Sequence, residues 1–219
     1  FRWPAPDGTW TSLTWAATAQ RSREIGAGLV ALGVEVEDRV AIACSTRIEW
    51  ILADLGVLLA GAATTTVYPN TRPEDVAYIL ADSGSVVLVA EDAVQLAKVV
   101  DHRAEVPALR AVVLLDAAGV DVAAHDGWVM TLDDLAARGR EELGKSPSVV
   151  DDRVAQLRPP MLATLIYTSG TTGKPKGVEL THDNWLYLGE STEETRIVQA
   201  DHLQFLWLPL SHVFAKLLV

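Results

Sequence analysis

Short uninterrupted apolar runs alternate with helix-forming patterns along most of this chain, and this alternation constrains the fold more than any other feature. We expect strands at residues 40–44, 64–67, 86–89 and 112–115. Apolar runs that lack a polar residue at every second position are typical of strands covered on both faces. The sequence therefore predicts an α/β fold, with a parallel or mixed sheet flanked by helices on both faces.

Helices are expected between these strands, at residues 14–32, 46–60, 71–82, from 92 onward, and at 131–143. Thr46 with Glu49, and Thr71 with Glu74, each have the spacing of a capping box, in which two side chains satisfy backbone N–H groups at a helix start. Gly33 follows the first helix and supplies the left-handed residue with which many helices end.

A proline-containing segment at residues 146–160 is the predicted linker between two regions. Residues 1–145 make up the first α/β region. The second region, residues 161–219, has four expected parts: a strand at 161–167, a glycine-rich loop at 168–177, a capped helix at 181–194 and a last strand at 204–208.

The composition excludes several classes of protein. The net charge is −11 and no long stretch is basic, so no nucleic-acid partner is expected. Cys44 is the single cysteine, which excludes an internal disulfide and a cysteine-based zinc site and fits a reducing cytosol. The longest apolar run, residues 55–63, is about half of what a membrane helix needs. The chain begins at Phe1 without a leader and ends on an apolar run, so we expect it to be a piece of a longer polypeptide.

The loop at residues 168–177 combines three glycines, four hydroxyl residues and two lysines within ten positions. Glycines let backbone N–H groups turn toward an anion, hydroxyls add uncharged donors, and lysines supply positive charge for phosphate oxygens. The composition and the position after a strand predict a polyphosphate site, and a solvated hairpin is the alternative.

Two common nucleotide motifs do not fit this loop. A Walker A loop requires glycine where this chain has Thr168, and Ser or Thr where Pro175 follows Lys174. The Rossmann fingerprint also lacks its first glycine, because Thr168 stands there.

The loop closely resembles the AMP-binding signature of the adenylate-forming superfamily, which includes acyl-CoA synthetases, adenylation domains and luciferases. The resemblance covers residues 167–178 together with Leu180, Thr181 and His182. Residues 208–214 are similar to a motif that long-chain fatty-acyl-CoA synthetases carry further along. Earlier stretches are similar to the N-terminal region of the same branch: residues 39–42, Arg47, Glu49, Trp50 and residues 67–71. The chain is thereby identified as an incomplete N-terminal part of an AMP-binding domain.

The resemblance implies a ligase that works in two steps. ATP and a fatty acid give an acyl-adenylate and pyrophosphate, and the thiol of coenzyme A then displaces AMP. The implied nucleotide-binding residues are Thr168, Ser169, Gly170, Thr171, Thr172, Gly173, Lys174 and Lys176. The implied catalytic residues are Lys174, Lys176 and His212, and the implied ligand of Mg²⁺ is Thr168.

His212 follows the expected last strand, at the carboxyl edge of the sheet where α/β proteins bind ligands. The resemblance implies that it lies beside the acyl carboxyl, where a neutral imidazole would orient or polarise the carbonyl. The alternative is a histidine that caps the next helix. Lys216 stands where some relatives have a tryptophan that gates the acyl tunnel, so the resemblance does not extend to that role.

The family pattern continues beyond Val219 with an acidic motif, a ribose-binding aspartate, a hinge and a C-terminal lid that carries a catalytic lysine. We therefore expect the lid to be absent here and this polypeptide alone not to turn over. Two other functions stay open: an adenylation domain for a different carboxylic acid, and a non-catalytic nucleotide-binding module. The expected location is the cytoplasm, with fatty acid, ATP and coenzyme A as partners; peripheral membrane contact and a homodimer are left open.

Overall fold

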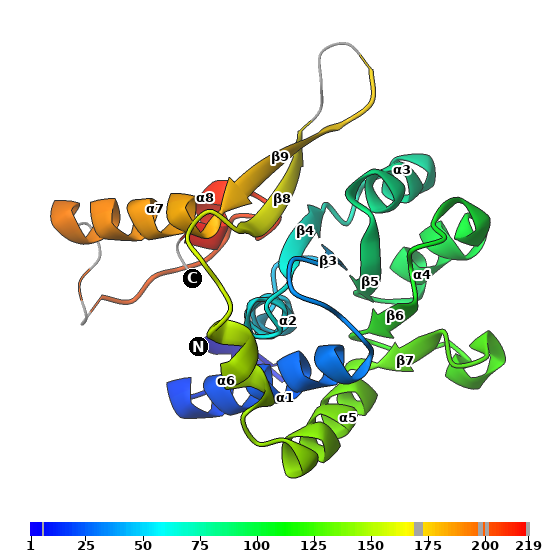
Figure 1. Cartoon of the computed structure of the whole chain (residues 1–219), viewed down its shortest axis with the longest axis horizontal. Coiled ribbons are helices and arrows are strands. Elements are labelled where there is room, and N and C mark those ends of the chain that lie inside the picture. Colours follow the sequence, from blue (N-terminus) through cyan, green and yellow to red (C-terminus); the bar gives the residue numbers. More distant parts are fainter. Residues whose placement is uncertain (6, 169–172, 197–198, 200–201, 218–219) are drawn as a thin grey trace.

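The computed structural model describes residues 1–5, 7–168, 173–196, 199 and 202–217, and strands and helices alternate through most of it (Figure 1). The strands are β1 Arg2–Pro4, β2 Trp10–Ser12, β3 Arg39–Ala43, β4 Ala63–Val67, β5 Ser85–Ala90, β6 Ala111–Leu114, β7 Val129–Thr131, β8 Leu162–Thr168 and β9 Lys176–Thr181. The α-helices are α1 Trp15–Ala31, α2 Ile48–Leu59, α3 Pro73–Ser83, α4 Ala93–Val100, α5 Leu132–Lys145, α6 Val149–Val154, α7 His182–Thr195 and α8 Val213–Leu217. Two short 3₁₀ helices are η1 Arg103–Glu105 and η2 Val122–His125.

The main sheet has the strand order β7-β6-β5-β3-β4-β8-β9. Every neighbouring pair runs parallel except β8 and β9, which are antiparallel. Strands β1 and β2 form a separate antiparallel pair near the N-terminus. The prediction of an α/β fold with a parallel or mixed sheet is confirmed.

Helices cover both faces of this sheet, which explains the uninterrupted apolar strands. Successive residues of β3 enter opposite layers: Val40 and Ile42 belong to a core cluster with α1, α2 and α5, while Ala41 and Ala43 belong to one with α3 and α4. All four side chains are buried. A polar residue at any of these positions would lie in one of the two cores.

Helices α1 and α5 pack closely at two glycines. A Cβ atom built on Gly139 of α5 would lie 1.7 Å from the carbonyl oxygen of Glu24, and one built on Gly28 of α1 would lie 2.3 Å from that of Leu135. The contact is therefore one of backbone against backbone, and a larger residue at either glycine requires the helices to separate.

Two predicted helix starts are wrong. Helix α2 begins after Arg47 and α3 after Arg72, and neither capping position makes a side-chain cap hydrogen bond. Pro73 sets the start of α3, since proline is favoured in the first turn, where its missing N–H is not needed. The helix starts expected at residues 92 and 131 and the capped helix expected at 181 are confirmed: Asp92 accepts from the Gln95 N–H, and Thr131 and Thr181 form capping boxes.

The predicted linker folds onto the body of the protein. It contains helix α6, whose Asp151 accepts two hydrogen bonds from Arg23 of α1, at 2.7 and 2.9 Å. The sheet also continues across the segment, because β8 pairs with β4. The proline-containing segment is therefore packed against the rest of the protein and is not a free linker.

Two elements after residue 161 differ from the prediction. Residues 176–177 were expected in the loop and no element was expected at 178–180, but these residues belong to β9, an edge strand of which four of six residues are exposed. The strand expected at residues 204–208 is wrong: these residues are irregular, and Phe205 and Trp207 are 82% and 72% exposed. An apolar run forms a strand only where a neighbouring strand accepts its hydrogen bonds.

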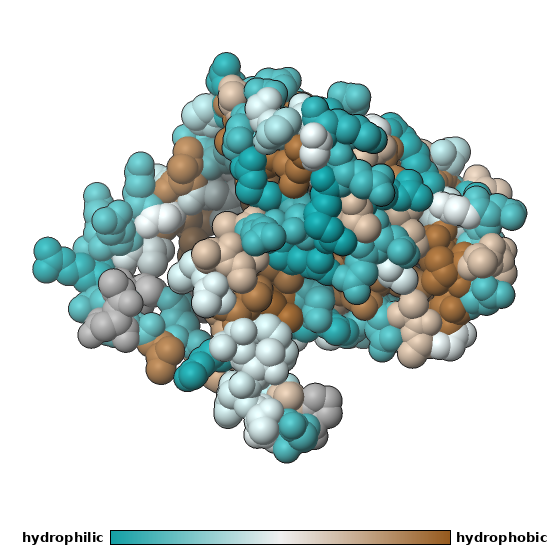
Figure 2. Space-filling model, turned by 90° about the horizontal axis from the view of Figure 1, so that it is seen from below, coloured by the Kyte–Doolittle hydropathy of each residue, from teal (hydrophilic) through white to brown (hydrophobic). Residues whose placement is uncertain are grey.

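No helix in the described part of the chain combines the length and apolar character needed to cross a bilayer. On the face shown in Figure 2, apolar residues form separate patches divided by hydrophilic ones.

Candidate functional site

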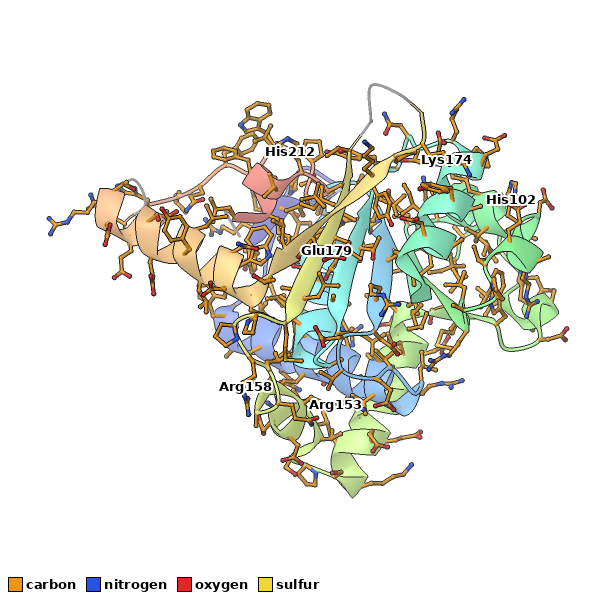
Figure 3. All side chains as sticks on the ribbon, turned by 45° about the horizontal axis from the view of Figure 1, so that its top comes forward. His102, Arg153, Arg158, Lys174, Glu179 and His212 are labelled. Carbon is orange, nitrogen blue, oxygen red and sulfur yellow. The ribbon has the colours of Figure 1, made fainter. Side chains whose placement is uncertain are left out.

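The parallel strands bring several chain segments to one edge of the sheet. Strands β3, β4, β5 and β8 all end at this edge, which we call the carboxyl edge. Figure 3 shows Lys174 and His212 at this edge, and Arg153 and Arg158 at the opposite one. Ligands of open α/β sheets bind beyond the carboxyl ends of strands, so the topology brings both predicted site segments to the expected place.

The stem of the glycine-rich loop is a hairpin formed by β8 and β9. Tyr167 pairs with Gly177 and Thr168 pairs with Lys176 across it. A Cβ atom on Gly177 would lie 3.1 Å from the ring of Tyr167, so the glycine leaves room for that ring. Ser169, Gly170, Thr171 and Thr172 lie outside the described residues. The structure thus brings Thr168 and Lys176 together at the base of the loop.

A tyrosine pair fixes this stem to helix α3. The Tyr167 hydroxyl donates to Asp82 Oδ2 at 2.7 Å, and the Tyr78 hydroxyl donates to Asp82 Oδ1 at 3.4 Å. Burial, followed by the hydrogen bond to Asp82, raises the pKa of Tyr167 well above its usual range, so this phenol stays protonated and keeps donating. The end of β8, where the loop begins, is thereby held in place.

The two loop lysines differ in their surroundings. Lys174 Nζ lies 4.6 Å from the ring centroid of Tyr78, within the range of a cation–π contact. Lys176 is exposed on β9. Within the described ranges neither lysine makes an ion pair with a carboxylate, so both charges can meet an anion at the carboxyl edge.

The segment with His212 is held at the same edge by hydroxyl groups of other elements. Thr46 donates to the Leu208 carbonyl at 2.9 Å and accepts from the Leu210 N–H at 3.2 Å. Thr66 of β4 donates to the Ser211 carbonyl, and Ser211 donates to the Val67 carbonyl, both at 3.2 Å. Thr46, predicted to be a helix cap, instead positions this distant segment.

His212 is exposed, and its Nδ1 accepts the backbone N–H of Phe214 at 3.2 Å. This contact caps the start of α8, as one of the two alternatives predicted. An Nδ1 that accepts a hydrogen bond leaves Nε2 as the protonated nitrogen of the neutral ring. The imidazole therefore offers a donor to the solvent side, and its role in chemistry stays a prediction.

The fit of Mg²⁺ to this edge rests on one residue. Thr168 is exposed at the end of β8 and supplies a single hydroxyl oxygen. Across the described ranges, no three His, Cys, Asp or Glu side chains gather as a metal site. Mg²⁺ is commonly bound through substrate phosphates with few protein ligands, so Thr168 fits as one ligand of an ion held mainly by phosphate oxygens.

Two acidic residues of structural importance were missed in the sequence. Glu91 follows β5 and accepts from both the N–H and the hydroxyl of Ser45, which ties together the segments after β3 and β5. Asp54 is buried in α2 and pairs with Lys216. Asp54 could have been singled out in the sequence because it lies within an otherwise apolar helical run. A carboxylate buried at such a position requires a partner.

Comparisons with known proteins agree with this geometry. The profile of the AMP-binding enzyme family matches residues 2–219. The chain is 37% identical to the long-chain-fatty-acid–CoA ligase FadD15 of Mycobacterium bovis, over 96% of this chain and 33% of the relative. It is 33% identical to the long-chain-fatty-acid–CoA ligase heimdall of Drosophila melanogaster, over 98% of this chain and 32% of the relative.

The fold is also similar to that of a crystal structure of ATP-bound MatB from Rhodopseudomonas palustris. The TM-score is 0.75 with 24% identity, over 97% of this chain and 38% of the solved one. The chain thus spans about a third of the length of the curated relatives it matches. Because the family profile covers almost every residue, this chain belongs to the AMP-binding enzyme family of adenylate-forming proteins.

Proposed function

We propose that this chain is part of a fatty-acid–CoA ligase, which activates a fatty acid with ATP and transfers the acyl group to coenzyme A. The observation that carries the proposal is the juxtaposition, at one edge of the sheet, of the hairpin stem of the glycine-rich loop and the His212 segment. The relatives at 37% and 33% identity, both named long-chain-fatty-acid–CoA ligases, support the acyl branch.

In the proposed first step, a carboxylate oxygen of the acid attacks the α-phosphorus of ATP and the bond to the β-phosphate breaks. Pyrophosphate leaves and an acyl-adenylate remains. Loop N–H groups of residues 169–173 with Lys174 and Lys176 would bind the β- and γ-phosphates and stabilise the charge of the leaving group. When bound, Mg²⁺ would neutralise phosphate charge, with Thr168 as a protein ligand.

In the proposed second step, the thiol of coenzyme A attacks the acyl carbon and AMP leaves. In both steps His212 would orient or polarise the acyl carboxyl group, because its Nδ1 accepts the Phe214 N–H and its Nε2–H is left to donate to a carbonyl oxygen. Replacement of His212 by alanine should lower adenylate formation, while unchanged pyrophosphate exchange would leave it with the capping role alone.

We propose the following division of the chain: residues 1–145 form the first α/β region, 146–160 connect it, and 161–219 carry the phosphate loop and the start of the acyl pocket. The remaining two thirds found in the relatives would supply the ribose contact and the lid. The 219-residue chain alone is then expected to make no acyl-CoA. A coupled assay that detects product from the purified chain would overturn this division.

Pyrophosphate exchange on the full-length gene product tests the function. We expect pyrophosphate exchange with fatty acids and little exchange with aryl or amino acids. The reverse preference would favour an adenylation domain for another acid. Nucleotide binding without exchange would favour a nucleotide-binding module. The double variant Lys174→Gln/Lys176→Gln should lose exchange by about 100-fold or more, since both charges act on the leaving group. Lys145→Gln is the matched control, because Lys145 is exposed at the end of α5, far along the chain from the carboxyl edge.

We further propose that the protein acts in the cytoplasm, where peripheral contact with membranes would give access to long acyl chains. Flotation of the full-length protein with liposomes tests the contact. Light scattering during chromatography tests the homodimer.

A further inference from the structure

Helix α8 is joined to the body of the protein by one buried ion pair. Lys216 Nζ lies 2.5 Å from Asp54 Oδ1, and the two side chains are 7% and 10% exposed. The Thr64 hydroxyl of β4 donates to the same carboxylate oxygen at 2.6 Å. The pair thus connects α8, helix α2 and the interior strand β4.

Two tryptophans flank the lysine. Lys216 Nζ lies 5.7 Å from the ring centroid of Trp50 in α2 and 5.6 Å from that of Trp185 in α7. The Trp185 indole N–H in turn donates to Thr164 of β8 at 3.1 Å. A buried ammonium group requires a carboxylate and is further stabilised by aromatic faces, and Lys216 has both.

This ion pair lies one helical turn from His212. The Lys216 N–H donates to the His212 carbonyl at 3.1 Å, so His212, directly before α8, is joined to Lys216 by the first backbone hydrogen bond of the helix. The irregular segment 203–208 lies further from the helix and is only partly anchored: Leu203 is 94% exposed, while Leu206 and Leu208 pack against the core. Within α8 itself, the buried contacts are made by Ala215 and by the Lys216 pair.

Hydroxyl groups fix the start of the helix, and the ion pair fixes its end. Ser211 bonds the end of β4, as described above, while Lys216 bonds α2. With both ends held, rotation of α8 about its axis is prevented. Rotation would carry His212 away from the carboxyl edge.

We propose that Lys216, through Asp54, is a positioning residue that orients His212 toward the acyl carboxyl. This inference rests on the proposed function for its catalytic readout and on the geometry alone for its structural readout. The charged partner of Lys216 is Asp54 of α2, whereas the proposed phosphate-binding residues belong to the β8–β9 hairpin, so loss of Lys216 should affect the chemical step and leave nucleotide binding largely unchanged.

The test compares three variants of the full-length protein: Lys216→Met, Lys216→Arg and the surface control Lys145→Met. We expect Lys216→Met to lower kcat for acyl-adenylate formation by about 10-fold to 100-fold, as misplacement of a reacting group by about 1 Å can do. The KM for ATP should stay within about twofold, because the phosphate loop belongs to a different segment. Lys216→Arg keeps the charge and should restore most of kcat, and the control should match the wild type.

Hydrogen–deuterium exchange of the peptide spanning residues 209–217 gives a second readout that needs no activity. Exchange in this peptide should rise by about 10-fold in Lys216→Met, with residues 85–131, which contain none of its partners, unchanged, since the opening is local. A folded Lys216→Met protein with wild-type kcat and exchange would overturn the inference, as would an ATP KM that rises as much as kcat falls. If the wild type activates no fatty acid, the proposed function fails, while the exchange data still decide whether Lys216 holds the helix.

Discussion

The six strands from β7 to β8 and the edge strand β9 belong to one sheet but differ in how they are covered. Strands β3, β4, β5, β6 and β8 are buried along most of their length. Strand β9 is mostly exposed, and α7 has no buried residue among its fourteen. We call these the covered half and the open half.

We include the residues that follow α7 in the open half. Of the twelve exposed large apolar residues in the described ranges, seven lie there: Val178, Leu186, Tyr187, Leu203, Phe205, Trp207 and Phe214. The polar residues predicted to act on substrate, Lys174, Lys176 and His212, lie there as well. The covered half thus supplies buried strand ends, while the open half carries the residues that we propose to bind ligand.

The largest effect is expected where the covered half is packed most closely. Gly139→Leu places a side chain against the backbone of α1, so the helices must separate. Overpacking typically costs about 1–3 kcal/mol, and we expect at least 3 kcal/mol here because the obstacle is backbone. Guanidinium unfolding measures the loss.

Gly144→Ala is the control, on the same helix and with no atom within 4 Å of the added Cβ. Alanine is the better helix former, so stability should stay equal or rise by about 1 kcal/mol. Equal unfolding midpoints for the two variants would show that α1 and α5 are not packed as described.

A smaller loss is expected where the two halves meet. Tyr167→Phe removes the hydroxyl that joins β8 to Asp82 of α3. A hydrogen bond of this kind contributes about 0.5–1.5 kcal/mol, and the same change should loosen the loop stem and raise the KM for ATP. Thermal unfolding and nucleotide titration are the measurements.

Tyr187→Phe in α7 provides the matched control, since Tyr187 is 70% exposed. Its effect should lie within about 0.5 kcal/mol. If both phenylalanine variants behave alike, the Tyr167 hydroxyl does not hold the loop stem to α3.

Secondary structure was predicted best from the sequence where the segment is buried. Val40 and Ile42 predicted their strand correctly, because a strand covered by helices on both faces requires a continuous apolar run. The same reasoning failed at Phe205 and Trp207, where an apolar run has no strand to pair with. Whether such a run forms a strand depends on hydrogen-bonding partners that are distant in sequence. A local sequence pattern gives no information about those partners.

The candidate site divides in the same way. The chemistry predicted for the loop follows from Lys174, Lys176 and their glycines, because it depends on adjacent residues, and it stays a prediction. The tie between Tyr167 and Asp82 spans 85 positions, and that between Lys216 and Asp54 spans 162. These contacts follow from topology, so a motif could identify the site but could not show how it is held.

Two equivalent helix caps allow a direct comparison of the halves. Thr131 caps α5 in the covered half and Thr181 caps α7 in the open half, each with a reciprocal capping box. Removing such a cap costs about 1 kcal/mol of helix stability. In Thr131→Ala this loss should appear in global unfolding, because α5 buries Leu132, Leu135 and Ala136.

In Thr181→Ala the same loss should appear mainly as faster hydrogen exchange in α7, with a global change below about 0.5 kcal/mol. Helix α7 buries no residue and can fray without opening the core. Equal global losses in the two alanine variants would contradict the division into a covered and an open half.

The smallest effect concerns Cys44, which lies directly after β3 and is 2% exposed. Burial, followed by the nearby Glu91 carboxylate, raises the pKa of this thiol far above its ordinary value of 9.0. A thiol that stays neutral in the folded state but ionises on unfolding contributes stability that is complete below pH 9 and is lost as the pH rises beyond it. Between pH 8 and 9.5 the wild type should therefore lose about 1 kcal/mol more stability than Cys44→Ala, which has no thiol to ionise.

Unfolding curves of both proteins across this pH range measure the difference. Both proteins contain the same other titrating groups, so the effects of those groups cancel when the two are compared. If the stability of both proteins changes equally with pH, the thiol ionises as easily in the folded chain as in the unfolded one. The carboxyl edge beside β3 would then be open to water, like the region around α7.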